Sequence, residues 1–301
     1  MLPKLLLIAS LQFVLTGCVT IHTTTPPAGD TTDHFRKPSA TKVVLVVLEN
    51  TNPDKARDEQ FLGRLAASGA YLSNYYAVAH PSQPNYVALI SGSTKGVVHG
   101  DLPITLDRPH LGQKLSQKLQ SWMTYAEGYP GGKCNLSTEI GRYARKHVPF
   151  LSFKDVQDDK VCRDHITGIN EFVVAAKAHN LPSFSLVIPD LDHDAHDKPL
   201  RDADAWLEKN FFDLIHDVEF RRDVLLIVTF DENATKWPYF WDTNNKVFTV
   251  IWGDDVIPGD YKAIYNHYDL HRTIEAIFDL PPNSTEPTTA RPIGGIWRQR
   301  K

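Results

Sequence analysis

The sequence lacks three features that would assign it to common protein classes. Its 32 basic residues do not exceed its 36 acidic ones, the net charge is −4, and the basic residues form no cluster. A nucleic-acid-binding surface needs such an excess or cluster, so no nucleic-acid partner is predicted. The apolar run Leu5–Val14 contains polar Ser10 and Gln12 and is too short for a membrane helix, which needs roughly 20 residues. No internal repeat is visible.

Cysteine is scarce, with three in 301 residues. Cys18 ends the tetrapeptide Leu-Thr-Gly-Cys, which follows Lys4 and the short apolar run, and this arrangement resembles the lipobox of bacterial lipoproteins. A plain secretory signal with a chance cysteine is the alternative. The lipobox interpretation predicts a signal peptide over residues 1–18, a lipid anchor on Cys18 that attaches the protein to a membrane, and a flexible Thr- and Pro-rich tether over 19–41. The protein is then an exported bacterial lipoprotein of the periplasm or outer membrane.

The two remaining cysteines, Cys134 and Cys162, form an even pair in a chain expected to be exported. Such a pair predicts a disulfide, and two buried thiols are the alternative.

Apolar runs and helical stripes alternate along the rest of the chain. The runs Lys42–Leu48 and Val224–Phe230 are apolar at nearly every position, which is typical of strands covered on both faces. Further strands are expected at Tyr71–Val78, Phe184–Ile188 and Val247–Trp252, and helices at Asp58–Ser68, Pro84–Ile90, Asp202–Ile215 and Tyr268–Phe278. This alternation predicts an α/β fold, a layered αβα sandwich with a mostly parallel central sheet, in one domain over residues 42–301. Weaker periodicity predicts an insertion over the sheet at about 100–180.

Three of the expected strands run directly into acidic residues, at Glu49, Asp190 and the pair Asp231 and Glu232. The carboxyl ends of parallel strands share one rim of the sheet, where ligands bind. Carboxylates that converge there repel one another unless a cation lies between them, and oxygen ligands suit hard divalent cations. For any single acid, the start of a loop or a helix cap is the alternative.

Ser82 lies immediately before a Pro-led helix start. A helix N-terminus offers free N–H groups and a positive dipole end, so it favours an anion such as phosphate. A serine there either caps the helix or attacks an ester held by those groups, with activation by a base or metal. Asn85, one turn along, is placed to donate to a phosphoryl oxygen. Residue type alone favours the cap.

The segment from Ser82 to Gly92 resembles the nucleophile segment of the alkaline phosphatase superfamily. Within that superfamily, His80–Gly92 is most similar to the phosphoesterase family of bacterial acid phosphatases and phospholipases C. Further segments fit the same family in order: Leu48–Asn50, Tyr143–Phe150, Pro189–Asp197, Thr229–Glu232 and His267–Glu275. The resemblance covers about Val43–Leu280.

The resemblance implies an alkaline-phosphatase-like fold and a metal-dependent phosphoric ester hydrolase. The activity implied is an acid-phosphatase-type phosphomonoesterase, which acts on a small phosphate ester through a phosphoserine at Ser82. One divalent metal ion (calcium, magnesium, manganese or zinc) is implied, bound by Glu49, Asn50, Asp231 and Glu232 beside the Ser82 hydroxyl. The other catalytic residues implied are Asn85, which holds the phosphoryl group, and His196 or His267 as acid. Possible substrate or second-site residues are Asp190, Asp194, His80 and His147.

The sequence departs from the family pattern in three places. Many superfamily members have Asp at the position of Glu49 and an Asp-His pair at Asp231-Glu232, and two-metal members have His at the position of Asp194. A single metal is therefore expected. The competing functions are a phospholipase C-type phosphodiesterase and a non-catalytic lipid-anchored binding protein of the same fold. The aromatic residues at 237–241 are expected to form either a wall for the leaving group or a packed loop.

Overall fold

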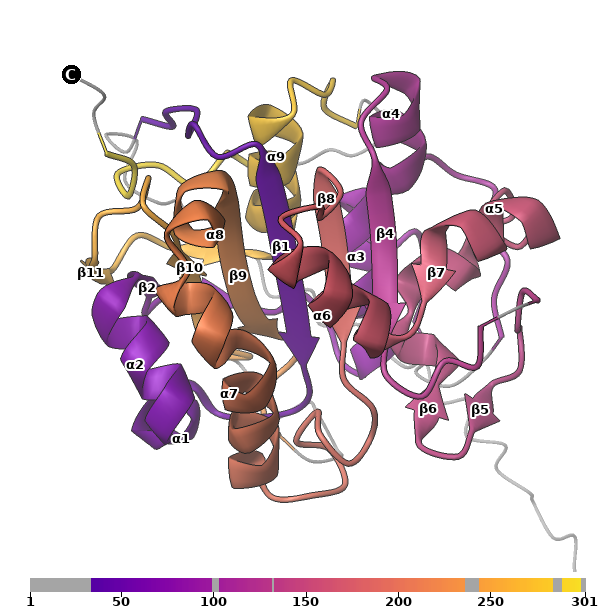
Figure 1. Cartoon of the computed structure of the whole chain (residues 1–301), viewed down its shortest axis with the longest axis horizontal. Coiled ribbons are helices and arrows are strands. Elements are labelled where there is room, and N and C mark those ends of the chain that lie inside the picture. The colour runs from indigo at the N-terminus through magenta and orange to yellow at the C-terminus, as the bar shows by residue number, and fades with distance from the viewer. Residues whose placement is uncertain (1–33, 99–102, 132, 236–243, 284–288, 299–301) are drawn as a thin grey trace, which may run out of the picture.

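A central sheet of eight strands organises the molecule in this computed structural model, which describes residues 34–98, 103–131, 133–235, 244–283 and 289–298 (Figure 1). Its spatial order is β11-β2-β10-β9-β1-β8-β4-β7. These strands are β1 (Lys42–Leu48), β2 (Ala70–Leu72), β4 (Trp122–Ala126), β7 (Ile166–Thr167), β8 (Phe184–Ile188), β9 (Val224–Phe230), β10 (Thr249–Trp252) and β11 (Gly259–Tyr261). Short pairs form beside it from β3 (Tyr75–Tyr76) with β12 (Tyr265–Asn266), and from β5 (Glu139–Ile140) with β6 (Tyr143–Ala144).

The sheet is mostly parallel, as the sequence predicts. Strand β1 pairs in parallel with both β9 and β8, and β4 pairs in parallel with β8 and β7. Only β10 runs against its neighbours β9 and β2. Parallel pairing brings the ends of β9, β1, β8 and β4 to one rim, so the residues that follow them lie side by side.

Helices cover both faces of the sheet and make the three layers of the sandwich. On one face lie α1 (Pro53–Asp58), α2 (Gln60–Ser68), α6 (Ile169–Lys177), α7 (Leu200–His216) and α8 (Val218–Asp223). On the other lie α3 (Ser82–Ser91), α4 (Leu111–Gln117) and α9 (His267–Ile277), and α5 (Asp159–His165) lies beside β7. Figure 1 shows α7 and α8 in front of the sheet, and α3 and α9 behind it.

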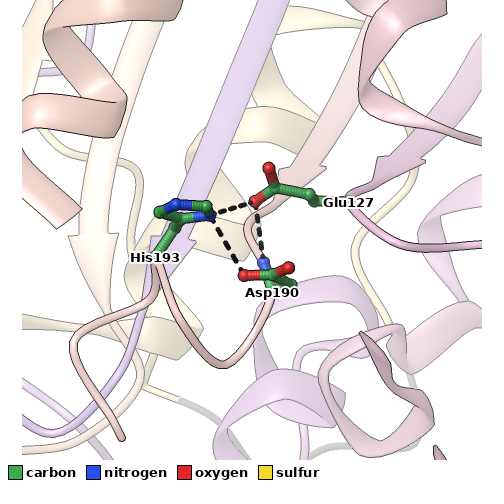
Figure 2. A group of neighbouring side chains, drawn as sticks. All are labelled: Glu127, Asp190 and His193. Carbon is green, nitrogen blue, oxygen red and sulfur yellow. Dashed lines mark hydrogen bonds and ion pairs between the residues drawn. The ribbon is translucent and has the colours of Figure 1, made fainter. Parts of the chain in front are cut away.

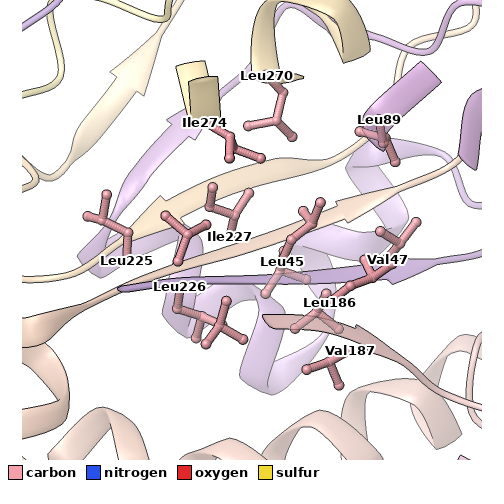
Figure 3. Packing of buried hydrophobic residues seen from close by; sticks show 14 of the residues in the cluster. Leu45, Val47, Leu89, Leu186, Val187, Leu225, Leu226, Ile227, Leu270 and Ile274 are labelled. Carbon is pink, nitrogen blue, oxygen red and sulfur yellow. The ribbon is translucent and has the colours of Figure 1, made fainter. Parts of the chain in front are cut away.

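The central strands are buried on both faces, which explains their continuous apolar runs. Every residue of β9 is buried, as is every residue of β1 except the first. Successive side chains of a strand point to opposite faces, so each strand contributes to both cores. Figure 3 shows Leu270 and Ile274 of α9 above the strands that carry Leu45 and Ile227.

Residues 100–180 are not an insertion over the sheet, and that prediction is wrong. Their described part contributes β4 and β7 to the sheet itself, and α4, α5 and α6 pack beside them. Strand β4 has the sequence Trp-Met-Thr-Tyr-Ala, whose mixed composition lacks the aliphatic run that marked β1 and β9. The weak pattern thus reflects strands at one side of the sheet.

The predicted strand Tyr71–Val78 and the predicted tether also need correction. The expected strand Tyr71–Val78 is divided, because the chain turns at Ser73 and Asn74 between β2 and β3. The expected tether does not reach residue 41. The backbone N–H groups of Ser39 and Ala40 each donate to Asp255 Oδ2 at 2.7 Å, and Ala40 is buried.

The predicted disulfide between Cys134 and Cys162 is present. It joins the loop before β5 to α5. No helix among the described residues combines the length and apolar character that a membrane crossing requires. The predicted signal peptide and Cys18 lie outside the described residues, and so do the aromatic residues at 237–241.

Candidate active site

The ends of β1 and β9 deliver two carboxylates to the same point on the rim. Leu48 and Phe230 are register partners in this parallel pair, and the Asp231 N–H donates to the Leu48 carbonyl at 2.9 Å. The next side chains, Glu49 and Asp231, are both fully buried. The acids that follow the two most hydrophobic strands therefore meet at the rim, as the sequence predicts.

Asn50 turns the chain back over these acids. Its φ of 27° lies at the edge of the left-handed region, which Asn adopts more readily than most residues. Its N–H donates to Asp231 Oδ1 at 3.2 Å. With the amide nitrogen turned inward, the side chain donates to Glu49 Oε2 and Asp231 Oδ1, both at 3.2 Å.

Ser82 begins helix α3 and faces these acids. Its hydroxyl lies 3.1 Å from Glu49 Oε2 and 3.2 Å from Glu232 Oε1, and the side chain is buried. A hydroxyl has one proton, so it donates to one carboxylate at a time while the other remains poised beside it. In this position the oxygen of Ser82 has two potential proton acceptors and the positive end of a helix dipole.

The carboxyl groups at this rim are buried close together, which disfavours their charged forms. Burial raises the pKa of Glu49 and of Glu232, and it raises that of Asp231 well above the usual range, with further repulsion from the two glutamates. Asp231 Oδ2 is buried and has no hydrogen-bond partner among the described residues. An orphan carboxylate oxygen beside two other carboxylates and an Asn amide fits a divalent cation with oxygen ligands.

Two histidines that the sequence left uncertain lie in this site. His80 pairs through Nδ1 with Glu232 Oε2. His147 Nε2 lies 3.1 Å from Glu49 Oε1, and its Nδ1 lies 3.4 Å from Asp194 Oδ2. Burial raises the pKa of Asp194 to about 8, and the nearby Glu49 carboxylate adds to the effect. His147 thus connects Glu49 to the loop that follows β8.

His196 lies on that same loop in a more open position. Its side chain is 36% exposed, and its Nδ1 lies 2.7 Å from Asp197 Oδ1. The backbone N–H of His196 donates to Asp194 Oδ1 at 2.8 Å. The ring can therefore exchange protons with solvent beside the buried carboxylates.

His267 is placed differently from the acid that the resemblance implies. Its Nε2 lies 2.7 Å from the Asp231 carbonyl, and its Nδ1 lies 3.0 Å from the Tyr75 hydroxyl. Burial lowers the pKa of His267 to about 4. A neutral ring with both nitrogens bound holds the backbone of Asp231 and has no free proton donor for a leaving group.

Asn85 also has partners other than the expected phosphoryl group. Its Oδ1 accepts from the N–H groups of Val78 and Ala79, both at 3.0 Å, and its Nδ2 donates to the Ala79 carbonyl at 2.8 Å. These bonds fix the loop that leads through His80 to Ser82. The amide thus holds the nucleophile loop in this structure.

Asp190 does not join the main cluster. It lies with Glu127, which follows β4, and with His193 (Figure 2). Sequence reasoning missed Glu127 because it lay in the supposed insertion, although it follows a strand just as Glu49 does. It also missed Tyr86, whose ring stacks on His147 at a centroid distance of 5.1 Å. The spacing of the two residues could have identified Tyr86, because a residue four positions after Ser82 lies on the same face of the helix.

A polar hollow of about 440 Å³ opens beside the rim. Asn52, two residues beyond Asn50, and Asn233, next to Glu232, line it. Arg57 and Lys246 add positive charge to its wall, and Asp54 adds negative charge.

The fold is that of the alkaline phosphatase superfamily. A protein of that superfamily from Vibrio parahaemolyticus superposes with a TM-score of 0.58 over 84% of this chain and 72% of its own, at 14% sequence identity. The chain itself belongs to the phosphoesterase family, which its sequence matches over residues 29–281.

Two relatives indicate the reaction class. The sequence is 33% identical over 267 residues to a phosphatidylinositol-3-phosphatase of Mycobacterium tuberculosis, covering 86% of this chain and 84% of that protein. It is 33% identical over 251 residues to a phosphate-repressible acid phosphatase of Penicillium chrysogenum, covering 80% of this chain but only 59% of the fungal protein. The chain is a hydrolase that acts on phosphoric ester bonds.

Proposed function

We propose that this chain is a metal-dependent phosphomonoesterase of the acid-phosphatase type that acts through a phosphoserine on Ser82. The observation that carries the proposal is the position of the Ser82 hydroxyl, 3.1 Å from Glu49 and 3.2 Å from Glu232 at the start of α3. A helix cap needs no such carboxylates, and a buried serine between them is suited to attack on phosphorus.

Two displacements make up the reaction. Ser82 Oγ bonds to phosphorus as the bond from phosphorus to the alcohol oxygen breaks, and the hydroxyl proton passes to Glu49 or Glu232. A water molecule then attacks phosphorus and gives a proton to His196. The bond from phosphorus to Ser82 Oγ breaks, the proton held by Glu49 or Glu232 returns to Ser82, and inorganic phosphate is released. The free N–H groups at the start of α3 stabilise the charge on the phosphoryl oxygens.

Glu49, Asn50, Asp231 and Glu232 are the residues that would hold the metal ion, with the Ser82 hydroxyl beside it. A bound divalent cation would lower the pKa of that hydroxyl and offset charge on the transferring group. The orphan oxygen of Asp231 supports this ligand set. The Asn50 side chain lies between Glu49 and Asp231, where its amide oxygen would be available to a bound cation. Oxygen ligands leave calcium, magnesium, manganese and zinc as candidates.

His196 is the group we assign to protonate the leaving alcohol. It is exposed enough to exchange protons, whereas the ring nitrogens of His267 are both engaged. His267 and Asn85 are assigned positioning roles, the first for the Asp231 backbone and the second for the loop before Ser82. His80, His147 and Asp194 complete the wall around the reacting phosphoryl group.

The polar hollow beside the rim supports a small polar leaving group. Its lining of amide and charged side chains, which includes Asp54, Arg57 and Lys246, suits a hydroxylated alcohol better than an acyl chain. This favours small soluble monoesters as substrates.

Hydrolysis of an aryl phosphate by the wild type and by Ser82→Ala tests the proposal. We expect the variant to lose activity on the order of 10³-fold or more, and chelation to abolish wild-type activity until a divalent cation is restored. Ser137→Ala, which removes an exposed hydroxyl, is the matched control. Retention of activity in Ser82→Ala would refute the assignment of the nucleophile.

The competing phospholipase C-type activity is tested with the same preparation. A monoester phosphatase hydrolyses aryl phosphate and phosphatidylinositol 3-phosphate but leaves a phosphorylcholine diester intact. The name of the mycobacterial relative motivates the lipid monoester in this panel. Preference for the diester would favour the phospholipase reading, and binding without turnover of any ester would favour a binding protein.

We further propose that Cys18 carries a lipid anchor that holds this domain in the periplasm or at the outer membrane. The support is the Leu-Thr-Gly-Cys segment that ends at this residue. Mass spectrometry of the N-terminal peptide from membranes of an expressing bacterium tests it. An unmodified Cys18 would leave the secretory-signal alternative.

A further inference from the structure

A second group of metal-ligating side chains lies on the same rim, at the ends of β8 and β4. Glu127 follows β4, and Asp190 and His193 follow β8. One donor atom from each lies within 4.8 Å of the other two. His193 Nδ1 lies 2.9 Å from Glu127 Oε2 and 3.1 Å from Asp190 Oδ1 (Figure 2). Two carboxylates and an imidazole nitrogen from three positions therefore face one point.

The positive charge near this point comes from the His193 ring and from Arg142, which lies close enough to act on Asp190. In the part of the chain that the structure describes, neither Glu127 nor Asp190 forms an ion pair with lysine or arginine. The nearby Arg142 is directed to the other acids of the loop, with its Nε 3.0 Å from Asp192 Oδ1 and its Nη2 bound to Asp197. Burial and the charge of Glu127 raise the pKa of Asp190, which agrees with two carboxylates held together.

A comparison within the chain separates this arrangement from an ordinary salt bridge. His179 also contacts two carboxylates, but through different nitrogens: Nε2 lies 2.9 Å from Asp217 Oδ2, and Nδ1 lies 3.0 Å from Glu219 Oε2. Each of its acids thus has a ring nitrogen of its own. At His193 both acids face the same nitrogen, which has only one proton to share.

We propose that Glu127, Asp190 and His193 form a second cation site, which takes a divalent ion that accepts both nitrogen and oxygen ligands, such as zinc or manganese. The neutral His193 ring coordinates through Nδ1 and keeps its proton on Nε2. Three protein ligands with partly exposed side chains leave a position for water. This site is distinct from the cluster around Ser82, and cation binding by these three residues does not depend on the proposed reaction.

The site fastens the loop that serves the active centre. His193 immediately precedes Asp194, and Asp190 lies four residues before it. The Asp194 carbonyl accepts from the Glu49 N–H at 2.7 Å, and its carboxylate faces His147. The Asp190 N–H donates to Glu127 Oε2 at 3.2 Å. This hydrogen bond already holds the loop against the end of β4 before a cation binds. A bound cation ties the loop to β4 and so orders Asp194 and His196.

Zinc binding by the chelator-treated full chain tests the proposal. Isothermal titration with Zn²⁺ gives the stoichiometry, and Co²⁺ in its place gives an absorption spectrum of each site. We expect His193→Ala to lose about one equivalent of Zn²⁺ relative to the wild type, or at least 10-fold in affinity for it. His179→Ala is the control and is expected to bind as the wild type does. Asp190→Asn, which preserves shape, repeats the measurement if His193→Ala is poorly folded by circular dichroism.

Asp231→Asn separates this proposal from that for the catalytic metal. Loss of one equivalent in His193→Ala and of a different one in Asp231→Asn supports both sites. Loss in His193→Ala alone supports the second site and shows that zinc does not occupy the site at Ser82. Equal Zn²⁺ binding by His193→Ala and His179→Ala, or no binding by the wild type, overturns the second site.

Discussion

At the scale of single residues, histidines of one rim have different tasks because they differ in exposure and in bonding. His267 is buried with both nitrogens bound, so it is neutral and holds the Asp231 backbone. His196 is 36% exposed and close to the buried carboxylates. The residue type is the same in both cases, so only the environment of each ring distinguishes these roles.

The assignment of His196 as the acid makes a prediction about leaving groups. A poor leaving alkoxide needs a proton in the transition state, and a nitrophenolate does not. We expect His196→Ala to lose about 100-fold in kcat/KM for an alkyl phosphate and less than about 10-fold for p-nitrophenyl phosphate. Steady-state kinetics on both esters measures this, with exposed His216→Ala as the control. An equal loss on both esters would contradict a role in protonation.

The burial of His267 predicts a dependence of stability on pH. Its pKa is lowered to about 4 in the folded protein, from about 6.5 in an unfolded chain, so the unfolded state binds the proton first. Stability is therefore fully present above about pH 6.5 and falls as the pH decreases towards 4, by roughly 3 kcal/mol from this residue.

Urea unfolding at pH 7 and pH 4.5 checks this prediction in the presence of chelator. We expect His267→Gln to lose less stability on acidification than the wild type does. His216→Gln, on the surface, is expected to behave as the wild type. Identical losses in all three proteins would show that His267 titrates normally.

At the scale of elements, α3 positions the nucleophile at one end and packs closely at the other. Gly92 ends the helix with a φ of 68°, and a Cβ there would lie 2.8 Å from His271 Cδ2 of α9. Gly96 has a similar φ of 78° but open space around it. A side chain at either position would therefore suffer the same left-handed backbone strain, but only a side chain at Gly92 would also collide with α9.

Alanine substitutions at these two glycines separate the cost of backbone strain from the cost of the collision with α9. Gly96→Ala is expected to cost about 1 kcal/mol, from the left-handed backbone alone. Gly92→Ala is expected to cost roughly 1–3 kcal/mol more, because α9 must move away from α3. Denaturant unfolding of both variants measures the difference. Equal costs would mean that the α3–α9 contact yields without strain.

The sequence predicted much at this scale, and its failures have physical causes. β1 and β9 were predicted with correct bounds because both faces of each are buried, and the acids after them therefore met as expected. The partner of Asp190 was not predictable, because it depends on β4 lying beside β8, and β4 has no aliphatic run. The bonds of Asn85 and His267 depend on loop geometry that composition does not encode.

At the scale of the whole molecule, the site is a cluster of like charges within the fold, so it costs stability when no cation is bound. Asp231 is the extreme case, with a buried oxygen that has no hydrogen-bond partner among the described residues. Any cation that binds only the folded protein raises the melting temperature with its concentration.

The corresponding prediction concerns the thermal stability of Asp231→Asn with and without a cation. In chelator, Asp231→Asn is expected to melt at least as high as the wild type, because it removes an uncompensated buried charge. The second arm compares His193→Ala with the double variant His193→Ala/Asp231→Asn. On addition of a divalent cation, the Tm of His193→Ala should rise and that of the double variant should stay unchanged. Differential scanning fluorimetry measures both arms. A cation-induced rise of equal size in both backgrounds would place the ion elsewhere.

The sheet ends on each side in a very short strand. β11 has three residues and β7 has two, whereas the seven-residue β1 and β9 lie in the middle of the order. A long exposed edge offers a template on which another chain can add a strand, and natural proteins blunt that hazard by keeping edge strands short. Copies of this domain crowded together thus have little free backbone through which their sheets can fuse into aggregates.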